Sequence, residues 1–358
     1  MYLIYLQYAV ICLLLLAPLT GCVNRRNQEQ SNNQASNNSK NASRIDTILQ
    51  RGKLICGVGA DLPGFSFVSK EGKYGGLDVD ICRAVAAALF DNPNAVEFRP
   101  LTPKERFSAM QAGEVDMLSR NTTWTLARDT EVGMEFGPTV FYDGQGMMVT
   151  KESGIKTLKD LEGKSVCVQT GTTTEKNLSD QMAKAGVKYT PLVFEETDAT
   201  FAAYAQGRCQ GVTTDRSQLA GRRSILPKPE DHLILDVTMS KEPLAPCVLN
   251  GDSRWFDAMK WIVYALMNAE ELEINSQNVT QLATTSTDPV VRRFLGAEGN
   301  LGSGMGLPQD FAVRVIKHVG NYGELYERNL GPKTPLNLPR GINTPWTKGG
   351  LMYSPPFL

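Results

Sequence analysis

The strongest constraint on the fold is an alternation of apolar runs and helical segments that occurs twice along the chain. Each pass has three short apolar runs separated by two segments typical of helices. This order predicts two α/β lobes, each with its own sheet, as the length of 358 residues also suggests. Strands are expected at residues 54–58, 96–101 and 115–119, then at 164–169, 189–194 and 210–215, with helices at 81–90, 104–112, 172–185 and 198–206.

The part of the chain after Pro243 has a helical pattern. Residues 255–273 form a long amphipathic segment, and residues 288–295 and 309–328 are expected to be further helices. From Leu330 onward the sequence holds six prolines, which predict irregular structure.

The N-terminus predicts export and attachment to a membrane. Residues 4–19 are an apolar run that fits the core of a signal peptide spanning residues 1–21. The run ends in Leu19-Thr-Gly-Cys22, which resembles a bacterial lipobox, so Cys22 is expected to carry a lipid. No Lys or Arg precedes the run and Arg25-Arg26 follows it, so an uncleaved anchor is the alternative. Residues 22–43 are polar and predict a flexible linker.

Several function classes find no support in the sequence. The 37 basic and 38 acidic residues balance, which gives no reason to expect a nucleic-acid partner. There is no G-x-G-x-x-G, P-loop or G-x-S-x-G motif, and the two histidines and seven cysteines show no metal-binding spacing. We therefore expect no cofactor, no metal and no catalytic residues.

Polar residues at the ends of predicted strands suggest a site for a small zwitterion. Arg128 offers a planar fork for a carboxylate, with Asn121 and Thr123 as neutral hydrogen-bonding neighbours. In the second pass, Thr172-Thr-Thr-Glu175 fits a capping box, and the free N–H groups of a helix start bind anions. Asp215 ends the last strand, where it could hold an ammonium group. Taken singly, each feature is better explained as a solvated side chain or a helix cap. Their combination predicts a clamp for both ends of an α-amino acid.

Five cysteines remain once Cys12 in the signal peptide and Cys22 are set aside. In an exported protein we expect disulfides. Cys56 with Cys82, and Cys167 with Cys209, are the candidate pairs, and Cys209 with Cys247 is a rival.

The body of the chain resembles the family 3 periplasmic solute-binding proteins of amino-acid ABC transporters, and within it the general (polar) L-amino-acid-binding branch. The resemblance covers residues 44–358. Its motifs are Leu101-Thr-Pro-Lys-Glu-Arg-Phe107, Ser119-Arg-Asn-Thr-Thr-Trp-Thr-Leu-Ala-Arg128, Tyr142-Asp-Gly-Gln-Gly146, Val166-Cys-Val-Gln-Thr-Gly-Thr-Thr-Thr-Glu175, Ser240-Lys-Glu-Pro243 and Val319-Gly-Asn-Tyr-Gly-Glu324.

The resemblance implies a two-lobed type II clamshell with two hinge strands, near residues 143–147 and 241–245, and a helical C-terminal extension on lobe 1. Lobe 1 would comprise residues 44–144 and 244–358, and lobe 2 residues 145–243. By position, the implied ligand contacts are Arg128, Thr173 and Thr172 for the α-carboxylate, Asp215, Thr123 and Asn121 for the α-ammonium, Phe65 or Phe67 as an aromatic wall, and Arg106 for the side chain.

The function so predicted is a monomeric binding protein outside the cytoplasmic membrane that delivers polar L-amino acids (Glu, Gln, Asp or Asn) to the permease of an ABC transporter. The alternative is a dehydratase-like enzyme on the same fold, because fold alone does not decide function.

Overall fold

The structure is a computed structural model that describes residues 43–358. The predicted signal peptide, Cys22 and the linker up to residue 42 lie outside the described residues. Within the described part of the chain, no helix combines the length and the apolar character needed to cross a membrane.

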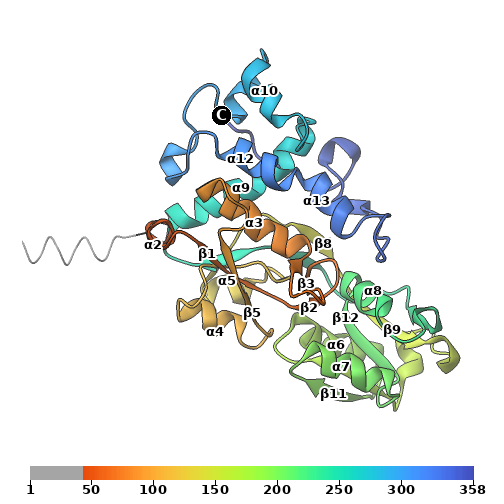
Figure 1. Cartoon of the computed structure of the whole chain (residues 1–358). Coiled ribbons are helices and arrows are strands. Elements are labelled where there is room, and N and C mark those ends of the chain that lie inside the picture. Colours follow the sequence, from red (N-terminus) through yellow and green to blue (C-terminus); the bar gives the residue numbers. More distant parts are fainter. Residues whose placement is uncertain (1–42) are drawn as a thin grey trace, which may run out of the picture. The chain divides into compact units, whose positions relative to one another are not determined.

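The first sheet is built mainly from the first pass of the chain (Figure 1). Its strand order is β5 (Val96–Pro100), β1 (Leu54–Val58), β6 (Met117–Leu118), β15 (Cys247–Leu249) and β7 (Met134–Phe136). Strands β5, β1 and β6 are parallel, whereas β15 runs antiparallel to both of its neighbours. One face packs against α3 (Leu77–Phe90) and α9 (Ser253–Glu271), and the other against α4 (Arg106–Gln111). The core of lobe 1 therefore lies on both faces of this sheet.

The second sheet repeats the same arrangement with the second pass. Its order is β11 (Thr190–Phe194), β10 (Ser165–Gln169), β12 (Gly211–Asp215), β9 (Gln145–Thr150) and β13 (His232–Ile234). Residues along β9 alternate between two cores: Met147 and Val149 pack with α6 (Thr173–Ala185), whereas Met148 packs with α7 (Thr197–Ala205) and α8 (Arg216–Ser224). Two sheets with separate cores confirm the predicted two-lobed fold.

Two short antiparallel strands connect the lobes. β8 (Phe141–Asp143) pairs with β14 (Glu242–Leu244), and the chain enters the second sheet directly after β8 and returns to the first directly after β14. These are the hinge strands of the fold. Beside them, a small sheet of β2 (Asp61–Leu62), β3 (Ser66–Val68) and β4 (Tyr74–Gly75) projects from lobe 1 toward α8.

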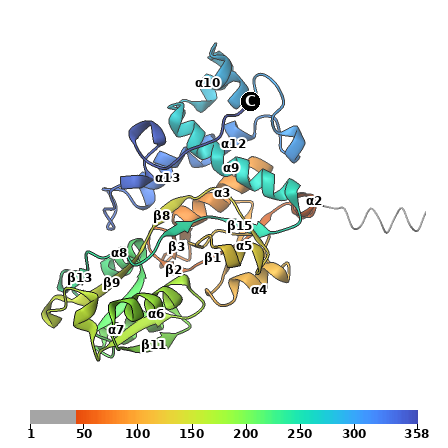
Figure 2. The same cartoon turned by 180° about the vertical axis from the view of Figure 1, so that it is seen from behind.

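The C-terminal helices lie beside α3 and α9 (Figure 2), and their apolar residues enlarge the core of lobe 1. They are α10 (Val279–Thr285), α11 (Pro289–Phe294), α12 (Phe311–Val319) and α13 (Tyr322–Asn329). The single helix predicted for residues 309–328 was wrong. Gly320 ends α12, and Asn321 begins α13 through a capping box with Glu324. The tail forms only the short 3₁₀ turns η5 (Gly341–Asn343) and η6 (Trp346–Lys348) after residue 330.

The remaining elements are short. They are α2 (Arg44–Arg51) and α5 (Leu126–Thr130), with the 3₁₀ turns η1 (Lys151–Ser153), η2 (Leu158–Leu161), η3 (Pro229–Asp231) and η4 (Ser303–Met305). Each lobe contains one disulfide, Cys56–Cys82 in the first and Cys167–Cys209 in the second, as expected from the sequence. Cys247 is a buried free thiol, so the rival pairing with Cys209 does not occur.

Candidate ligand-binding site

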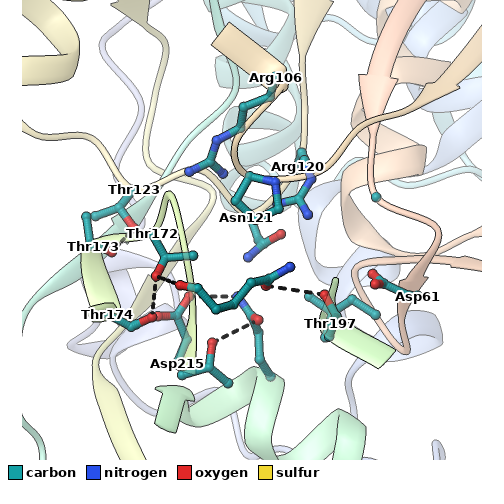
Figure 3. Close-up of a pocket in the computed structure, with 16 residues that line it drawn as sticks. Asp61, Arg106, Arg120, Asn121, Thr123, Thr172, Thr173, Thr174, Thr197 and Asp215 are labelled. Carbon is teal, nitrogen blue, oxygen red and sulfur yellow. Dashed lines mark hydrogen bonds between the residues drawn. The ribbon is translucent and has the colours of Figure 1, made fainter. Parts of the chain in front are cut away.

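The candidate site is a polar cavity between the lobes, at the ends of strands from both sheets. It contains about 480 Å³ of empty space, a figure that includes open solvent. Figure 3 shows Arg106, Arg120 and Asn121 approaching the cavity from one side and Asp215 from the opposite side. The lining residues are Gly59, Asp61, Leu62, Pro103, Arg106, Arg120, Asn121, Thr123, Gln169, Thr172, Thr173, Thr174, Thr197, Thr214, Asp215 and Gln218.

Lobe 1 supplies two buried guanidinium groups to the cavity. Arg106 lies on α4 and donates to the Thr122 hydroxyl at 3.2 Å, and Arg120 follows β6 and donates to the Leu101 carbonyl at 2.5 Å. Burial lowers the pKa of the Arg106 guanidinium well below its usual range, and the neighbouring Arg128 and Arg120 add to this. Arginine nevertheless stays protonated in proteins. The lobe 1 side of the cavity is therefore positively charged and suited to a carboxylate.

The loop that carries Asn121 is held by a buried carboxylate. Asp78, at the start of α3, accepts a hydrogen bond from the Asn121 backbone N–H at 2.9 Å. This bond supports the left-handed conformation of Asn121, whose φ is 36°. Burial raises the pKa of Asp78 to about 6, although the hydrogen bond from Asn121 and the charge of Arg120 act in the opposite direction.

Lobe 2 contributes the start of α6. The Thr172 hydroxyl accepts a hydrogen bond from the Glu175 backbone N–H at 3.1 Å, so Thr172 is a helix cap as well as a cavity residue. Gly171, with a φ of 73°, precedes it and lies close to the backbone of Lys104 in lobe 1. The first N–H groups of a helix have no partner within the helix. The start of α6 therefore brings unpaired amide donors to the cavity wall.

Asp215 is, with Asp61, one of the two acidic residues that line the cavity. It is the last residue of β12 and is 3% exposed. Its side chain makes no capping hydrogen bond to α8 and instead accepts one from Gln218 at 3.0 Å. Burial raises the pKa of Asp215 well above its usual range, and the nearby carboxylates of Asp143 and Glu242 raise it further. A carboxyl in this environment would be stabilised by a cation from a ligand.

Arg128 lies behind the cavity wall in this structure. Its guanidinium donates to the Thr123 carbonyl at 2.8 Å and lies 5.3 Å from the centre of the Phe107 ring. The Arg106 guanidinium lies 4.9 Å from the same ring. Phe107 therefore packs against the guanidinium groups of both Arg106 and Arg128. Through its hydrogen bond to the Thr123 carbonyl, Arg128 supports the part of the wall that Thr123 forms.

Most of the residues singled out from the sequence line the cavity. The structure brings together Arg106, Asn121, Thr123, Thr172, Thr173 and Asp215. Phe65 is buried against Phe141, and Phe67 is 38% exposed on β3; neither lies among the cavity residues.

Sequence reasoning missed Asp61, Arg120 and Gln169, although each lies at or just beyond a strand end, the signal that identified the others.

Another buried carboxylate lies directly behind the wall. Glu242, on the hinge strand β14, is 1% exposed and accepts hydrogen bonds from the hydroxyls of Thr123 at 2.6 Å and Thr173 at 2.9 Å. These two residues belong to opposite lobes. The sequence motif Ser240-Lys-Glu-Pro243 contained this residue, but nothing in the sequence indicated that its carboxylate contacts two residues of the cavity wall.

A second cavity adjoins the first. It is lined by residues that include Asp61, Arg120 and Gln169, which also line the first cavity, and it holds about 770 Å³ of empty space that includes open solvent. Glu105, Glu196 and Asp198 also line it. Arg120 thus lies at the boundary between a deep cavity and a wider, more acidic one.

Comparisons with known proteins agree on the kind of protein. Residues 54–279 match the bacterial extracellular solute-binding proteins, family 3. A general L-amino acid-binding periplasmic protein of Rhizobium johnstonii is 47% identical over 88% of this chain and 93% of its own length. A glutamate/glutamine/aspartate/asparagine-binding protein of Rhodobacter capsulatus is 46% identical over 88% of this chain and 94% of its own length.

A solved structure supports the same relationship at the level of the fold. It is an ABC transporter periplasmic binding protein from Brucella ovis with glutathione bound. The TM-score is 0.86 at 46% sequence identity, and the match covers 88% of this chain and all of that one. The type II arrangement of lobes is therefore shared over nearly the whole described chain.

Proposed function

The chain belongs to the bacterial extracellular solute-binding proteins, family 3, and from this premise we propose that its inter-lobe cavity captures polar L-amino acids for an ABC transporter. The observation that carries the proposal is the charge arrangement in the cavity. Arg106 and Arg120 lie on one side and Asp215 on the other, with the start of α6 between them. This arrangement is complementary to a molecule that carries both a carboxylate and an ammonium group.

The roles of individual residues follow from this complementarity. Asp215 would bind the α-ammonium, aided by Thr123 and Asn121. The backbone amides at Thr172 and Thr173 and the buried charge of Arg128 would stabilise the α-carboxylate. Arg106 and Arg120 would then face the side chain. Two guanidinium groups at that position favour acidic and amide side chains, and the Rhodobacter relative is named for glutamate, glutamine, aspartate and asparagine.

A second candidate ligand is a γ-glutamyl peptide such as glutathione. Its glutamyl end carries the same amino-acid group, and the Brucella relative has glutathione bound. The cavity beyond Arg120 offers room for an extension that the deep cavity does not. Glutathione therefore belongs in any ligand screen beside the free amino acids.

The lobes would close on the ligand as two bodies, residues 44–144 with 244–358 and residues 145–243. A monomer delivering its ligand to membrane permease subunits fits a family described as extracellular. We propose that Cys22 anchors the protein by a lipid at the outer face of the membrane. Labelling with a radioactive fatty acid, with Cys22→Ser as the control, would test this, and equal labelling of both proteins would contradict it.

A role in transport rather than catalysis is the simpler proposal. The relatives of high identity are named as binding proteins. One more distant structure is an ancestral amino-acid-binding protein described as a precursor of cyclohexadienyl dehydratase, at 28% identity. Incubation of the protein with its ligand, followed by mass spectrometry, would reveal any turnover.

The decisive experiment is a thermal-shift panel of the twenty L-amino acids and glutathione, followed by calorimetric titration of those that stabilise. A ligand at 100 times its dissociation constant stabilises by about 2.7 kcal/mol, which is easily measured. We expect shifts with glutamate, glutamine, aspartate and asparagine, and none with their D-enantiomers. The absence of a shift with every L-amino acid and with glutathione would contradict the proposal.

A further inference from the structure

The carboxylate of Glu242 is saturated with hydrogen bonds that come from three parts of the molecule. Its Oε2 accepts from the Thr123 hydroxyl in lobe 1 and from the Thr173 hydroxyl at the start of α6 in lobe 2. Its Oε1 accepts from the side-chain amide of Asn177 at 2.9 Å and from the hydroxyl of Ser240. Each carboxylate oxygen thus accepts two hydrogen bonds from the protein, so the carboxylate is satisfied without a ligand.

This arrangement fixes the direction in which two cavity hydroxyls point. A threonine hydroxyl has one proton to donate and two lone pairs that accept. Thr123 and Thr173 both line the cavity, and both give their proton to Glu242, which is absent from the cavity lining. Only their lone pairs remain for a ligand. Both oxygens therefore act as acceptors toward the cavity.

An acceptor pair cannot bind a carboxylate but does suit an ammonium group. We propose that Glu242 is a positioning residue that commits the hydroxyl protons of Thr123 and Thr173, so that this corner of the cavity binds the ammonium group of the ligand. The inference rests on the proposed function, because it assigns a group of an amino-acid ligand. It also revises one role: Thr173 would serve the carboxylate only through its backbone N–H, while its hydroxyl serves the ammonium.

The same geometry has a competing explanation with the opposite consequence. Glu242 could occupy the position of a ligand carboxylate in the empty protein and leave when the ligand arrives. Removing its charge would then strengthen binding, because a competitor would be gone. Under our proposal the same change weakens binding. The sign of the effect separates the two.

The test is a calorimetric titration of L-glutamate and L-glutamine into the wild type and the Glu242→Gln variant, which keeps the shape of the side chain. We expect binding at least tenfold weaker in Glu242→Gln. Asn177→Ala is the matched control, since it removes a donor from Oε1 and leaves both threonine bonds in place. Its dissociation constant should stay within about threefold of the wild type. Unchanged or tighter binding by Glu242→Gln, or an equal loss in Asn177→Ala, would overturn the inference.

A double-mutant cycle separates positioning from a general structural effect. If Glu242 acts through Thr173, the Glu242→Gln change should cost at least threefold less affinity in a Thr173→Val background than in the wild type. Simple multiplication of the two losses would instead mean that Glu242 acts independently of Thr173 and would reject the proposal.

Neutron diffraction from crystals of the ligand-free wild type gives an answer that needs neither a ligand nor a variant. We expect the hydroxyl hydrogens of Thr123 and Thr173 on the lines to Glu242. Hydrogens that point into the cavity would refute the inference even if amino acids bind. Conversely, if no amino acid binds but both hydrogens point to Glu242, the proposed function fails while the assigned hydroxyl direction holds.

Discussion

If Asp215 holds the ammonium group of the ligand, as proposed, ligand binding should release a proton from its carboxyl group. In the empty cavity, burial and the neighbouring carboxylates hold its pKa well above the usual range. An ammonium group in contact with it would favour the charged form and lower that pKa. Binding to the protonated protein must then expel the proton, so the affinity should fall as the pH falls, by up to tenfold per pH unit below the free-state pKa.

Titrations in buffers with different ionisation enthalpies would measure the released proton between pH 5 and 8. Asp215→Asn is the control: it should bind at least about 100-fold more weakly, within the range known for truncated buried charge pairs, and should release no proton. An affinity that is constant over this pH range in the wild type would argue against a role for Asp215 in holding the ammonium.

Two other buried carboxyls should make the ligand-free protein more stable at mildly acidic pH. Burial raises the pKa of both Asp78 and Asp143 to about 6, above the ordinary 3.8. Between these values the folded state holds more protons than the unfolded state, so stability is greatest at the acidic end and is lost as the pH rises through 6. We expect each group to contribute about 1 kcal/mol between pH 7 and pH 5. Urea unfolding at the two pH values, with Asp78→Asn reducing the difference, would check this; higher stability at pH 7 would contradict it.

The sequence indicated which residues line the cavity better than it indicated how their side chains are oriented. The ends of strands can be found from apolar periodicity, and Asn121, Thr173 and Asp215, which were singled out near such ends, all line the cavity. The direction of a side chain beyond a strand depends on loop dihedrals that periodicity does not encode. Asn121 has a positive φ and is hydrogen-bonded to Asp78. In this loop Arg120 lines the cavity, whereas Arg128 lies behind the wall. A contact such as Thr123 with Glu242, 119 residues apart, has no local signature at all.

At the scale of elements, long periodic segments were predicted well and short ones poorly. Helices α3 and α9 lie close to the expected ranges because each buries an apolar face, and the strands of both passes lie within their expected ranges. Strand β15 has three residues and was missed, since Cys247–Leu249 is too short to show a period. The break between α12 and α13 was also missed, although Gly320-Asn321 and Glu324 form a recognisable end and start of helices.

Helix α8 offers a test in which stability and ligand affinity should change in opposite directions. Gly221 lies within α8, where alanine favours a helix by about 1 kcal/mol over glycine. A Cβ at this position would, however, lie 2.9 Å from the Pro63 carbonyl oxygen in lobe 1. Gly221→Ala should therefore raise the thermal stability of the open protein and weaken ligand binding, because the lobes can no longer approach as closely.

Calorimetric titration and thermal unfolding of Gly221→Ala, each compared with the wild type, would measure the two effects. Gly186→Ala is not a matched control, because Gly186 has a positive φ of 69°. Gln218→Ala on the same helix is also unsuitable, because Gln218 lines the cavity. Arg223→Ala, on the partly exposed side of α8, is preferable and should leave affinity unchanged. Full affinity in Gly221→Ala would mean that closure does not bring α8 against Pro63.

At the scale of the whole molecule, the structure has the lobes in contact around the cavity. Arg222 of α8 donates to the Asp61 carbonyl at 2.8 Å, and Lys104 of lobe 1 pairs with Glu195 of lobe 2. Both partners of the second contact are 61% exposed, so this ion pair should add little to the free energy of closure. Closure would therefore depend mainly on the buried contacts at the cavity and on the ligand itself. During closure, the backbone dihedral angles need to change only at the few residues that connect β8 and β14 to the two sheets.

Each lobe has its own disulfide, and neither bridge crosses the cavity. The bonds Cys56–Cys82 and Cys167–Cys209 close segments of 26 and 42 residues. Loop-closure entropy predicts a loss of about 3–4 kcal/mol of unfolding free energy when either is removed. In Cys56→Ala/Cys82→Ala and in Cys167→Ala/Cys209→Ala, guanidinium unfolding should show this loss, whereas the ligand dissociation constant below the transition should stay within about threefold. A variant that remains folded but loses affinity along with stability would contradict this expectation. It would show that removing the disulfide changes the cavity through the core of that lobe.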